Sequence, residues 1–408
     1  MNAQIQKLYD IARKPERRIV GLMSGTSLDG LDVALCRISG SGPDTHVVLE
    51  QFTTVPYDDT LKADIRIIFA KTEIEFEQLC LLNPYIGRLH GQLILNCLSD
   101  WGMTPAEIDL VASHGQTVYH APKSQHRRDK FPNATLQIGD GDHVAAVTGI
   151  ITVSDFRQKH VAHGGEGAPL AVYGDYFIFS KTGESALGEN RILLNMGGIA
   201  NFTYLPADGR ANDVFTTDTG PGNTLLDVYA RQFLNKAYDK DGALAAQGKV
   251  NSNLLRALKA NPFFDAPFPK TTGPEVFNIH YVEDAQIQSQ TTDVTPADLM
   301  VTLVQFSADT IADAVRRVMQ RNELYRVVGP RIYMSGGGMH NPMLTEAIQR
   351  QLDNCTFGRT DELGIPGDAK EAVLFAVLAN ESLAGGTTSF GNRQGVPNVT
   401  MGKISFPK

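Results

Sequence analysis

The sequence has few features of an exported, membrane-bound or disulfide-stabilised protein. Only four cysteines occur among 408 residues, and none forms a CxxC pair or stands near a histidine at zinc-ligand spacing. The stretch before residue 19 has no apolar segment like that of a signal peptide, and the longest uncharged apolar run, residues 372–379, is too short to span a membrane. These absences argue against structural zinc and favour a reduced, cytoplasmic protein without a membrane partner.

Positive charge is also scarce. The formal net charge is -8, and the only basic clusters, residues 13–18 and 126–130, are short and lack interleaved aromatic residues. Nucleic acid is therefore not an expected partner. A phosphate-bearing ligand would have to be held by backbone amides and a bound cation, which directs attention to glycine-rich turns.

The sequence also has few patterns that suggest a metal site. His160 and His163 form an HxxH pair, but no third ligand lies nearby in sequence, so we expect a solvated loop there. No metal site built from protein side chains is predicted.

The length and the order of elements predict two lobes of similar plan. Strands at residues 19–23 and 31–38 flank one glycine turn, and strands at 191–195 and 201–205 flank another. Each pair is followed by a third expected strand. We predict a first lobe over residues 1–157 and a second over 158–389, with the tail 390–408 packing back on the first.

Two long helices are expected, at residues 75–98, where Pro84 could kink or split the helix, and after a Thr295-Pro296 start. Buried strands are expected at 110–112 and 331–334, each entering a polar or glycine-rich segment. The ends of strands in α/β sheets are where ligands bind.

Three glycine turns are candidates for binding the phosphates of a nucleotide, since backbone N–H groups can approach a ligand closely there. The nucleotide is expected against Gly25, Thr26, Ser27, Leu28, Asp29, Gly30, Leu31 and Asp32 in the first lobe, and against Gly197, Gly198, Gly336, Gly337 and Gly338 in the second. The first turn alone is also explained as a tight hairpin. No Walker motif and no GxGxxG opening a helix occurs, so the duplicated fold of sugar kinases, actin and heat-shock chaperones remains the common solution for ATP.

Several blocks, in order, resemble the anhydro-N-acetylmuramic acid kinase family. They are residues 21–32 (GLMSGTSLDGLD), 113–117 (SHGQT), 137–140 (QIGD), 154–157 (SDFR), 164–170, 195–201 (NMGGIAN), 218–223 (DTGPGN), 335–338 (SGGG) and 368–372 (DAKEA). Family members usually have glutamine where Glu166 stands, a small residue at His163, and Gly-Ala where Met401-Gly402 stands. These departures leave the sugar contacts at that loop open.

The resemblance implies an α/β, duplicated actin-like (ribonuclease H-like) fold with a central active-site cleft. It implies a kinase that opens the 1,6-anhydro bridge of anhydro-N-acetylmuramic acid with water and phosphorylates O6 with ATP and Mg²⁺. The products would be N-acetylmuramate 6-phosphate and ADP, in peptidoglycan recycling. The partner would be a small amino sugar, and a homodimer is compatible with the sequence.

The resemblance also assigns residues. Asp218 matches the catalytic aspartate, although an aspartate before Thr-Gly-Pro is equally a turn or cap residue. Glu371 is suggested to face the sugar, yet Asp368 and Glu371 have capping-box spacing, which alone would explain both. Arg157 could pair with a sugar carboxylate or form a structural salt bridge.

His114, Thr117 and Asp140 are weaker candidates for polar sugar contacts, and a structural hydrogen bond is the commoner role for each. Two rival functions remain: a kinase of the same fold acting on another sugar or small acid, and an ATP-switched chaperone or filament protein. A chaperone would need a further client-binding domain, for which no residues are left.

Overall fold

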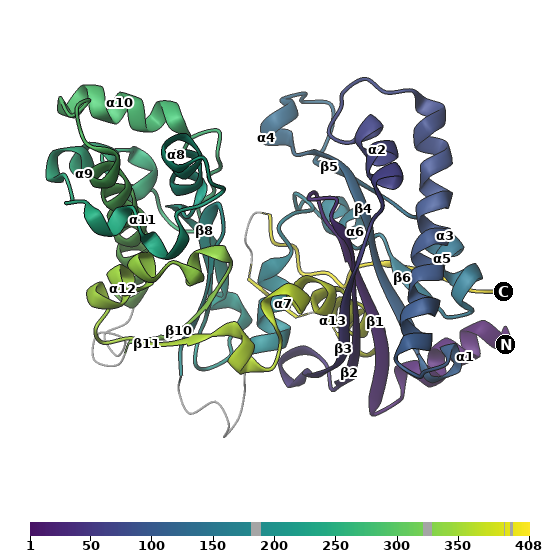
Figure 1. The fold of residues 1–408 in the computed structure, drawn as a ribbon. Helices are drawn as coiled ribbons and strands as arrows, with labels where there is room; N and C mark the ends of the chain where they lie inside the picture. The colour runs from purple at the N-terminus through teal and green to yellow at the C-terminus, as the bar shows by residue number, and fades with distance from the viewer. Residues whose placement is uncertain (181–188, 321–328, 387, 392–394) are drawn as a thin grey trace. The chain divides into compact units, whose positions relative to one another are not determined.

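The computed structural model describes residues 1–180, 189–320, 329–386, 388–391 and 395–408, and the chain forms two compact units (Figure 1). Unit 1 comprises Met1–Ser185, Gly209–Asp213 and Gly364–Lys408, and unit 2 comprises Ala186–Asp208 and Val214–Leu363. Unit 1 is therefore assembled from stretches that are far apart in the sequence.

Unit 1 is built on a seven-stranded sheet with the order β12-β6-β4-β1-β2-β3, to which β5 is added beside β4. The strands are β1 (Glu16–Ser24), β2 (Gly30–Ser39), β3 (His46–Pro56), β4 (Leu110–Ala121), β5 (Ala134–Ile138), β6 (Thr152–Ser154) and β12 (Lys403–Ser405). β1, β2 and β3 are antiparallel neighbours, whereas β4 runs parallel to β1 and β6 parallel to β4. The C-terminal strand β12 pairs antiparallel with β6, so the tail of the chain belongs to unit 1.

Helices cover both faces of this sheet (Figure 1). The helices of unit 1 are α1 (Ala3–Ala12), α2 (Asp59–Ile68), α3 (Phe76–Asp100), α4 (Lys123–His126), α5 (Gly141–Thr148), α6 (Phe156–Ala162), α7 (Ala171–Phe179) and α13 (Lys370–Ala384). Val20 and Leu22 of β1 lie in an apolar core with α3 and α5, while Gly21 between them faces α13. A Cβ at Gly21 would collide with the carbonyl oxygen of Ala372, so glycine lets α13 lie close on the sheet.

Unit 2 is built on a five-stranded sheet with the order β11-β10-β7-β8-β9. Its strands are β7 (Arg191–Met196), β8 (Ile199–Leu205), β9 (Phe215–Pro221), β10 (Arg331–Ser335) and β11 (Thr356–Arg359), and its helices are α8 (Thr224–Leu234), α9 (Ser252–Leu258), α10 (Ile279–Ser289), α11 (Pro296–Met319) and α12 (Pro342–Gln351). The long helix α11 starts as predicted, because the Thr295 side chain accepts the Asp298 N–H at 3.2 Å and Pro296 takes the first helical position.

The two units repeat one sheet plan, as the sequence predicted. The order β3-β2-β1-β4-β6 in unit 1 corresponds to β9-β8-β7-β10-β11 in unit 2. Within unit 2, β7, β8 and β9 are antiparallel neighbours and β10 and β11 follow in parallel, as in unit 1. The duplicated α/β fold is confirmed.

The division between the units differs from the predicted boundary near Arg157. Helices α7 and α13 and all but the first two residues of α6 were assigned to the second lobe, whereas all three helices belong to unit 1. The physical reason is that α13 covers the β1 face at Gly21, which the linear order of elements does not reveal. Unit 2 is correspondingly smaller than predicted.

Strand β4 is longer than the sequence suggested, and helix α3 is continuous where the sequence allowed a break. β4 continues to Ala121, so the SHGQT segment lies inside the strand and does not follow it. Helix α3 passes through Pro84 without being split. Asn83 beside it accepts the Gly139 N–H on its side chain at 2.9 Å, which fixes this part of the helix to the segment entering α5.

Candidate active site

The turn between β1 and β2, residues 25–29, is held at both ends by a buried hydrogen-bond network in unit 1. The Ser24 hydroxyl lies 3.1 Å from the Gly30 carbonyl oxygen and 2.6 Å from Gln116 Oε1. The Gln116 amide in turn donates to the Gly25 carbonyl at 3.0 Å. The turn is therefore positioned from β4 as well as by its own strands.

A second layer supports this network. The Tyr57 hydroxyl donates to Ser24 Oγ at 2.9 Å and lies 2.7 Å from His90 Nε2. Burial lowers the pKa of His90 to about 4, so the ring is neutral at neutral pH. All groups in the chain of contacts from His90 to Gly25 are therefore uncharged. This is expected for a buried network, because burying an unpaired charge is energetically costly.

The turn itself leaves room for a ligand. The position of a Cβ at Gly25 has no protein atom closer than 3.7 Å, whereas a Cβ at Gly30 would collide with the Val55 carbonyl oxygen. Leu28 has φ 57°, a left-handed conformation that closes the turn. The space beside Gly25 is open, so a phosphate could approach its backbone.

Two carboxylates flank the turn with different environments. Asp29 accepts the Ser27 hydroxyl at 2.6 Å, and this bond lowers the pKa of the Asp29 carboxyl. Burial raises the pKa of Asp32, while a hydrogen bond from Thr54 opposes the shift. In both residues these hydrogen bonds are made to Oδ1, and no described residue donates a hydrogen bond to Oδ2. The Oδ2 atoms of Asp29 and Asp32 are therefore available to a hydrated cation.

In unit 2 the two predicted glycine turns lie next to one another. The Gly197 carbonyl accepts the Asn223 N–H at 2.8 Å and the Gly198 carbonyl accepts the Thr224 N–H at 3.1 Å, at the start of α8. A Cβ at Gly336 or Gly338 would meet atoms of Met196 within 2.8 Å. The segments after β7 and β10 and the start of α8 thus form one backbone cluster.

A cavity opens beside this cluster. Its volume is about 380 Å³, and it is lined by Asn223, Leu226, Asp227, Tyr238, Asp239, Lys240, Asp241, Gly337, His340 and Asn341. A Cβ at Gly337 would have only Asn223 Nδ2 near it, at 3.5 Å. The cavity combines an aromatic ring, carboxylates and an open glycine backbone, which suits a nucleoside attached to phosphates.

Asp218 lies within β9. Its backbone N–H donates to the Lys270 carbonyl at 2.9 Å, and its Oδ2 accepts the Thr272 N–H at 2.8 Å. Burial raises the pKa of the Asp218 carboxyl to about 6, Glu275 adds to the rise, and the Thr272 N–H opposes it. Among the described residues nothing is bonded to Oδ1, so this oxygen can accept a proton from a ligand or water.

Lys270 and Thr272, which support Asp218, were not identified from the sequence. The Lys270 ammonium donates to the carbonyls of Phe263 and Phe264 at 2.8 and 3.0 Å, and burial lowers its pKa to about 8. The Thr272 hydroxyl is buried and has no hydrogen-bond partner within the described parts of the chain. No local motif marks this segment, because it meets β9 only through tertiary structure.

The half-buried Arg157 and the buried His114 form a hydrogen-bonded pair in unit 1. Arg157 Nε donates to His114 Nε2 at 2.7 Å, and Arg157 Nη1 donates to the Gly167 carbonyl at 2.7 Å. Burial lowers the pKa of Arg157 to about 10, and the negative charge of Glu371 opposes this shift. The guanidinium is charged at neutral pH. Both hydrogen bonds are made to neutral groups, so neither is the structural salt bridge that was one of the two predicted roles of Arg157.

Glu371 stands in the first turn of α13 and does not cap it. Ala369 is the N-cap residue, and no side-chain hydrogen bond closes that end of the helix, so the predicted capping box with Asp368 is wrong. The Glu371 side chain is exposed, yet nearby protein atoms remove part of its hydration and raise the pKa of its carboxyl, while Arg157 and Lys370 oppose the rise. No described residue forms a hydrogen bond with this carboxylate, which leaves it available for another role.

Asp140 and Thr117 lie apart from Arg157. Asp140 is the N-cap of α5, where its side chain accepts the Asp142 N–H at 2.8 Å. Thr117 Oγ1 accepts the Gln137 amide at 3.3 Å. Asp140 belongs to the α3 and α5 side of the sheet, whereas the His114 ring stacks on Phe375 of α13 at 4.6 Å. His114 is therefore hydrogen-bonded to Arg157, and it also lines one cavity together with Asp140, whereas Thr117 does not line that cavity.

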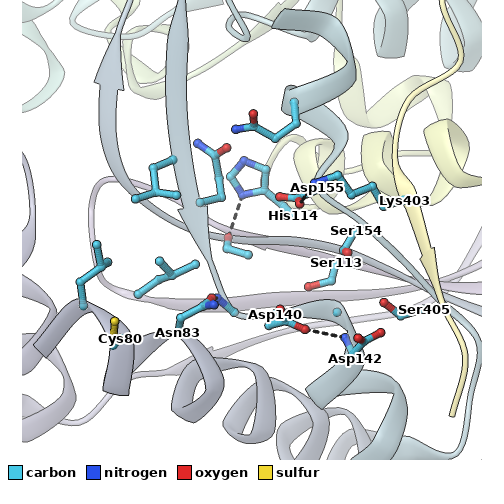
Figure 2. Close-up of a pocket in the computed structure, with 18 of the residues that line it drawn as sticks. Cys80, Asn83, Ser113, His114, Asp140, Asp142, Ser154, Asp155, Lys403 and Ser405 are labelled. Carbon is cyan, nitrogen blue, oxygen red and sulfur yellow. Dashed lines mark hydrogen bonds and ion pairs between the residues drawn. The ribbon is translucent and has the colours of Figure 1, made fainter. Parts of the chain in front are cut away.

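A polar cavity of about 690 Å³ adjoins Asp140. Figure 2 shows Cys80 and Asn83 on one side of it and Asp155 and Lys403, which are joined at 2.7 Å, on another. Among the residues that the structure places, none forms a hydrogen bond with the buried hydroxyl of Ser113. The cavity is open to polar groups of a small molecule.

The loop between α6 and α7 differs from the solvated loop predicted for the HxxH pair. His160 is buried, and its Nδ1 accepts the Gly167 N–H at 3.0 Å. His163 is exposed and bonded to the Lys159 carbonyl at 2.9 Å, and Glu166 is exposed. His160 thus holds the loop whose Gly167 carbonyl binds Arg157.

The described part of the chain contains no grouping of three or more His, Cys, Asp and Glu side chains suited to a metal ion. Within the same residues, no helix has both the length and the hydrophobicity that crossing a bilayer requires.

Comparison with known proteins gives a consistent result. The family model described as anhydro-N-acetylmuramic acid kinase matches residues 17–405. A protein of that name from Pseudoalteromonas atlantica is 55% identical over the full length of both chains, and one from Pseudoalteromonas translucida is 51% identical over the full length of both. A third, from Caldanaerobacter subterraneus, is 37% identical and covers 98% of this chain and 100% of its own.

Proposed function

Because the chain belongs to the anhydro-N-acetylmuramic acid kinase family, we propose that it uses ATP to phosphorylate 1,6-anhydro-N-acetylmuramic acid while opening its anhydro ring. Water adds its oxygen to C1 as the C1–O6 bond breaks, and O6 takes the γ-phosphoryl group. The products are N-acetylmuramate 6-phosphate and ADP. With ATP as donor and a cell-wall amino sugar as acceptor, the reaction belongs to peptidoglycan recycling in the cytoplasm.

The observation that carries the proposal is the environment of Asp218. A water attacking C1 must lose a proton, and a base works best when its pKa lies near the working pH. Asp218 has a pKa raised to about 6 and keeps Oδ1 without a partner among the described residues, while the Thr272 N–H holds Oδ2. We assign Asp218 as the general base on this ground and on the family match.

For the nucleotide, we assign the phosphates to residues 25–32 in unit 1 and to Gly197, Gly198 and Gly336–Gly338 in unit 2. The open backbone at Gly25 and Gly337 fits a phosphate, and the 380 Å³ cavity fits the nucleoside. Mg²⁺ bound to the triphosphate supplies charge neutralisation of the transferring group. Asp29 and Asp32 have the oxygen ligands to hold it through water.

For the sugar, we assign the lactyl carboxylate to the charged guanidinium of Arg157. Glu371, which has no hydrogen-bond partner among the described residues, is assigned to the sugar or to the attacking water. Thr117 and Asp140 are kept as polar contacts, and the 690 Å³ cavity beside Asp140 offers room for part of the substrate. Burial around Arg157 strengthens its attraction for a carboxylate.

A substrate panel tests the function. The protein is incubated with ATP, Mg²⁺ and one of several 1,6-anhydrosugars, with and without an N-acetyl or lactyl group, and the products are identified by mass spectrometry. We expect turnover only with the sugar that carries both groups. Equal turnover of an anhydrosugar without the lactyl group would favour the rival kinase, and ATP hydrolysis that no sugar stimulates would contradict both.

The pKa of Asp218 predicts the acid limb of the pH profile. A general base acts in its deprotonated form, so kcat/KM should fall as pH drops below about 6, by about tenfold per pH unit. The measurement is kcat/KM for the anhydrosugar between pH 4.5 and 8.5, within the range where circular dichroism shows a folded protein. A profile that stays flat down to pH 5 would contradict the assignment of the base.

A further inference from the structure

The short segment His114-Gly115-Gln116 of β4 contacts two different elements of unit 1. His114 reaches Arg157 on α6, and Gln116 reaches the turn between β1 and β2. Both side chains are buried, and the two ring nitrogens of His114 and the amide nitrogen and oxygen of Gln116 all take part in hydrogen bonds within the protein. From the sequence, His114 was a weaker candidate for a sugar contact, and Gln116 had no predicted role.

The hydrogen bonds of His114 fix its tautomer. Arg157 Nε can only donate, so His114 Nε2 must accept at 2.7 Å. The proton of the neutral ring is therefore on Nδ1, which donates to the Gly115 carbonyl at 2.8 Å. The ring is clamped in one orientation and holds the guanidinium of Arg157 from one side, while Gly167 holds it from another.

The bonds of Gln116 are equally complete. Its amide donates to the carbonyls of Gly25 and Thr117, each at 3.0 Å, and its Oε1 accepts from Ser24 at 2.6 Å. Gly25 opens the turn whose backbone we assign to the phosphates. Gln116 thus fixes the Gly25 carbonyl and, because a peptide group is planar, the direction of the Thr26 N–H in the same peptide group.

A bulge in β4 allows one segment to serve both elements. Leu22 pairs with Ser113 and Ser24 pairs with Gln116, so β4 has one more residue than β1 in this interval. Gly115 has φ 78°, and a Cβ there would lie 2.5 Å from the Ile138 carbonyl oxygen. Bulges redirect side chains in this way, and here glycine is required at the bulge.

We propose that His114 and Gln116 are positioning residues, His114 for Arg157 and hence the anhydrosugar, and Gln116 for the 25–29 turn and hence ATP. The proposal rests on the proposed function. It predicts that the two substrates are affected separately by substitutions two residues apart.

The experiment measures KM for each substrate in four variants. His114→Asn reaches only the Gly115 side and leaves Arg157 Nε unpaired, so we expect KM for the sugar to rise about tenfold and KM for ATP to stay within about twofold. His114→Gln can place an acceptor near the Nε2 position and should recover most of the loss. Gln116→Met and Gln116→Glu lose the donor to Gly25, so KM for ATP should rise about tenfold with KM for the sugar nearly constant.

The matched controls are His46→Gln and Gln92→Leu, since both side chains are exposed and lie outside the proposed site. Thermal unfolding identifies variants that do not fold. Two substitutions are made at Gln116, the apolar Met and the charged Glu, so that the role of Gln116 can still be tested if one of them does not fold. If folded variants of His114 and Gln116 raise both KM values together, or neither, the positioning roles are overturned.

A second measurement does not depend on activity. The nitrogen chemical shifts of a neutral histidine distinguish the two tautomers, so ¹⁵N NMR of the free protein should show the Nδ1–H form for His114, with assignment by the His114→Gln variant. An Nε2–H form would overturn the proposal even if the enzyme is active. If the wild type instead acts on no anhydrosugar while the tautomer is as expected, the proposed function fails and the structural pairing stands.

Discussion

Replacement of Asp218 by asparagine should abolish most of the turnover and leave the fold and the binding of ATP intact. Asparagine cannot accept the proton of the attacking water, and general-base catalysis contributes about 10² to 10⁴ in rate, so kcat should fall by roughly that factor. The measurement is steady-state turnover of the anhydrosugar, with ATP affinity determined by calorimetry. In ¹⁸O-labelled water the wild-type product should carry the label at the C1 hydroxyl and not in the phosphate.

The stability of this variant gives an independent check. Since the pKa of Asp218 is raised to about 6 in the folded protein, the folded chain binds more protons than the unfolded chain between the ordinary carboxyl pKa and about 6. The free energy of unfolding therefore falls as pH rises through that window, and the ionised carboxylate destabilises the fold above it. Asp218→Asn should be at least as stable as the wild type at pH 7.5.

Glu371→Gln is the comparison for Asp218→Asn. Glu371 lies in unit 1, and its carboxylate does not cap a helix. We therefore expect Glu371→Gln to cause no loss of stability and a smaller loss of turnover than Asp218→Asn. A fully active Asp218→Asn would remove that residue from the mechanism. Label in the phosphate would mean that water, and not the sugar, accepts the phosphoryl group.

Substitution of Gly25 by valine should weaken ATP binding by about 10- to 100-fold, the value of one or two lost backbone hydrogen bonds to a charged group. The protein itself tolerates a Cβ at this position, since the nearest atom is 3.7 Å away, so the added side chain occupies only the space assigned to the phosphates. The measurement is the Kd for ATP with Mg²⁺ by calorimetry, alongside thermal unfolding.

Gly386→Val is the matched control, because Gly386 has no atom within 4 Å of a Cβ position and no positive φ. It should leave both ATP affinity and stability unchanged. Gly30→Val serves the opposite purpose: its side chain would collide with the Val55 carbonyl, and it should destabilise the fold. An unaltered Kd in a folded Gly25→Val would contradict the placement of the phosphates.

The sequence predicted those elements whose signals are local. The strand pair around the 25–29 turn follows from short apolar runs on either side of a glycine turn, and the start of α11 at Thr295 follows from cap chemistry within a few residues. The repetition of the sheet plan was visible for the same reason. The extent of β4 beyond Ser113 was not, because polar residues there are stabilised by pairing with β5.

The site was predictable in its residue types and less so in its geometry. Glycine turns and Asp218 stand in recognisable blocks, but the support of Asp218 by Thr272 comes from a segment 54 residues later with no motif. The role of Gln116 depends on a bulge that sequence spacing does not reveal. Glu371 shows the reverse error, since capping-box spacing was present and the box does not form.

The discontinuity of unit 1 has a consequence for synthesis on the ribosome. The sheet of unit 1 is translated early, yet α13, which covers its Gly21 face, and β12, which completes its edge beside β6, emerge only after all of unit 2. Until then the nascent chain carries a half-covered sheet, the kind of exposed apolar face and open strand edge that chaperones bind. The last strand of unit 2 ends at Arg359, whereas the last strand of unit 1 is β12 near the C-terminus. Although unit 2 starts later in the sequence, all of its strands are therefore synthesised before those of unit 1 are complete.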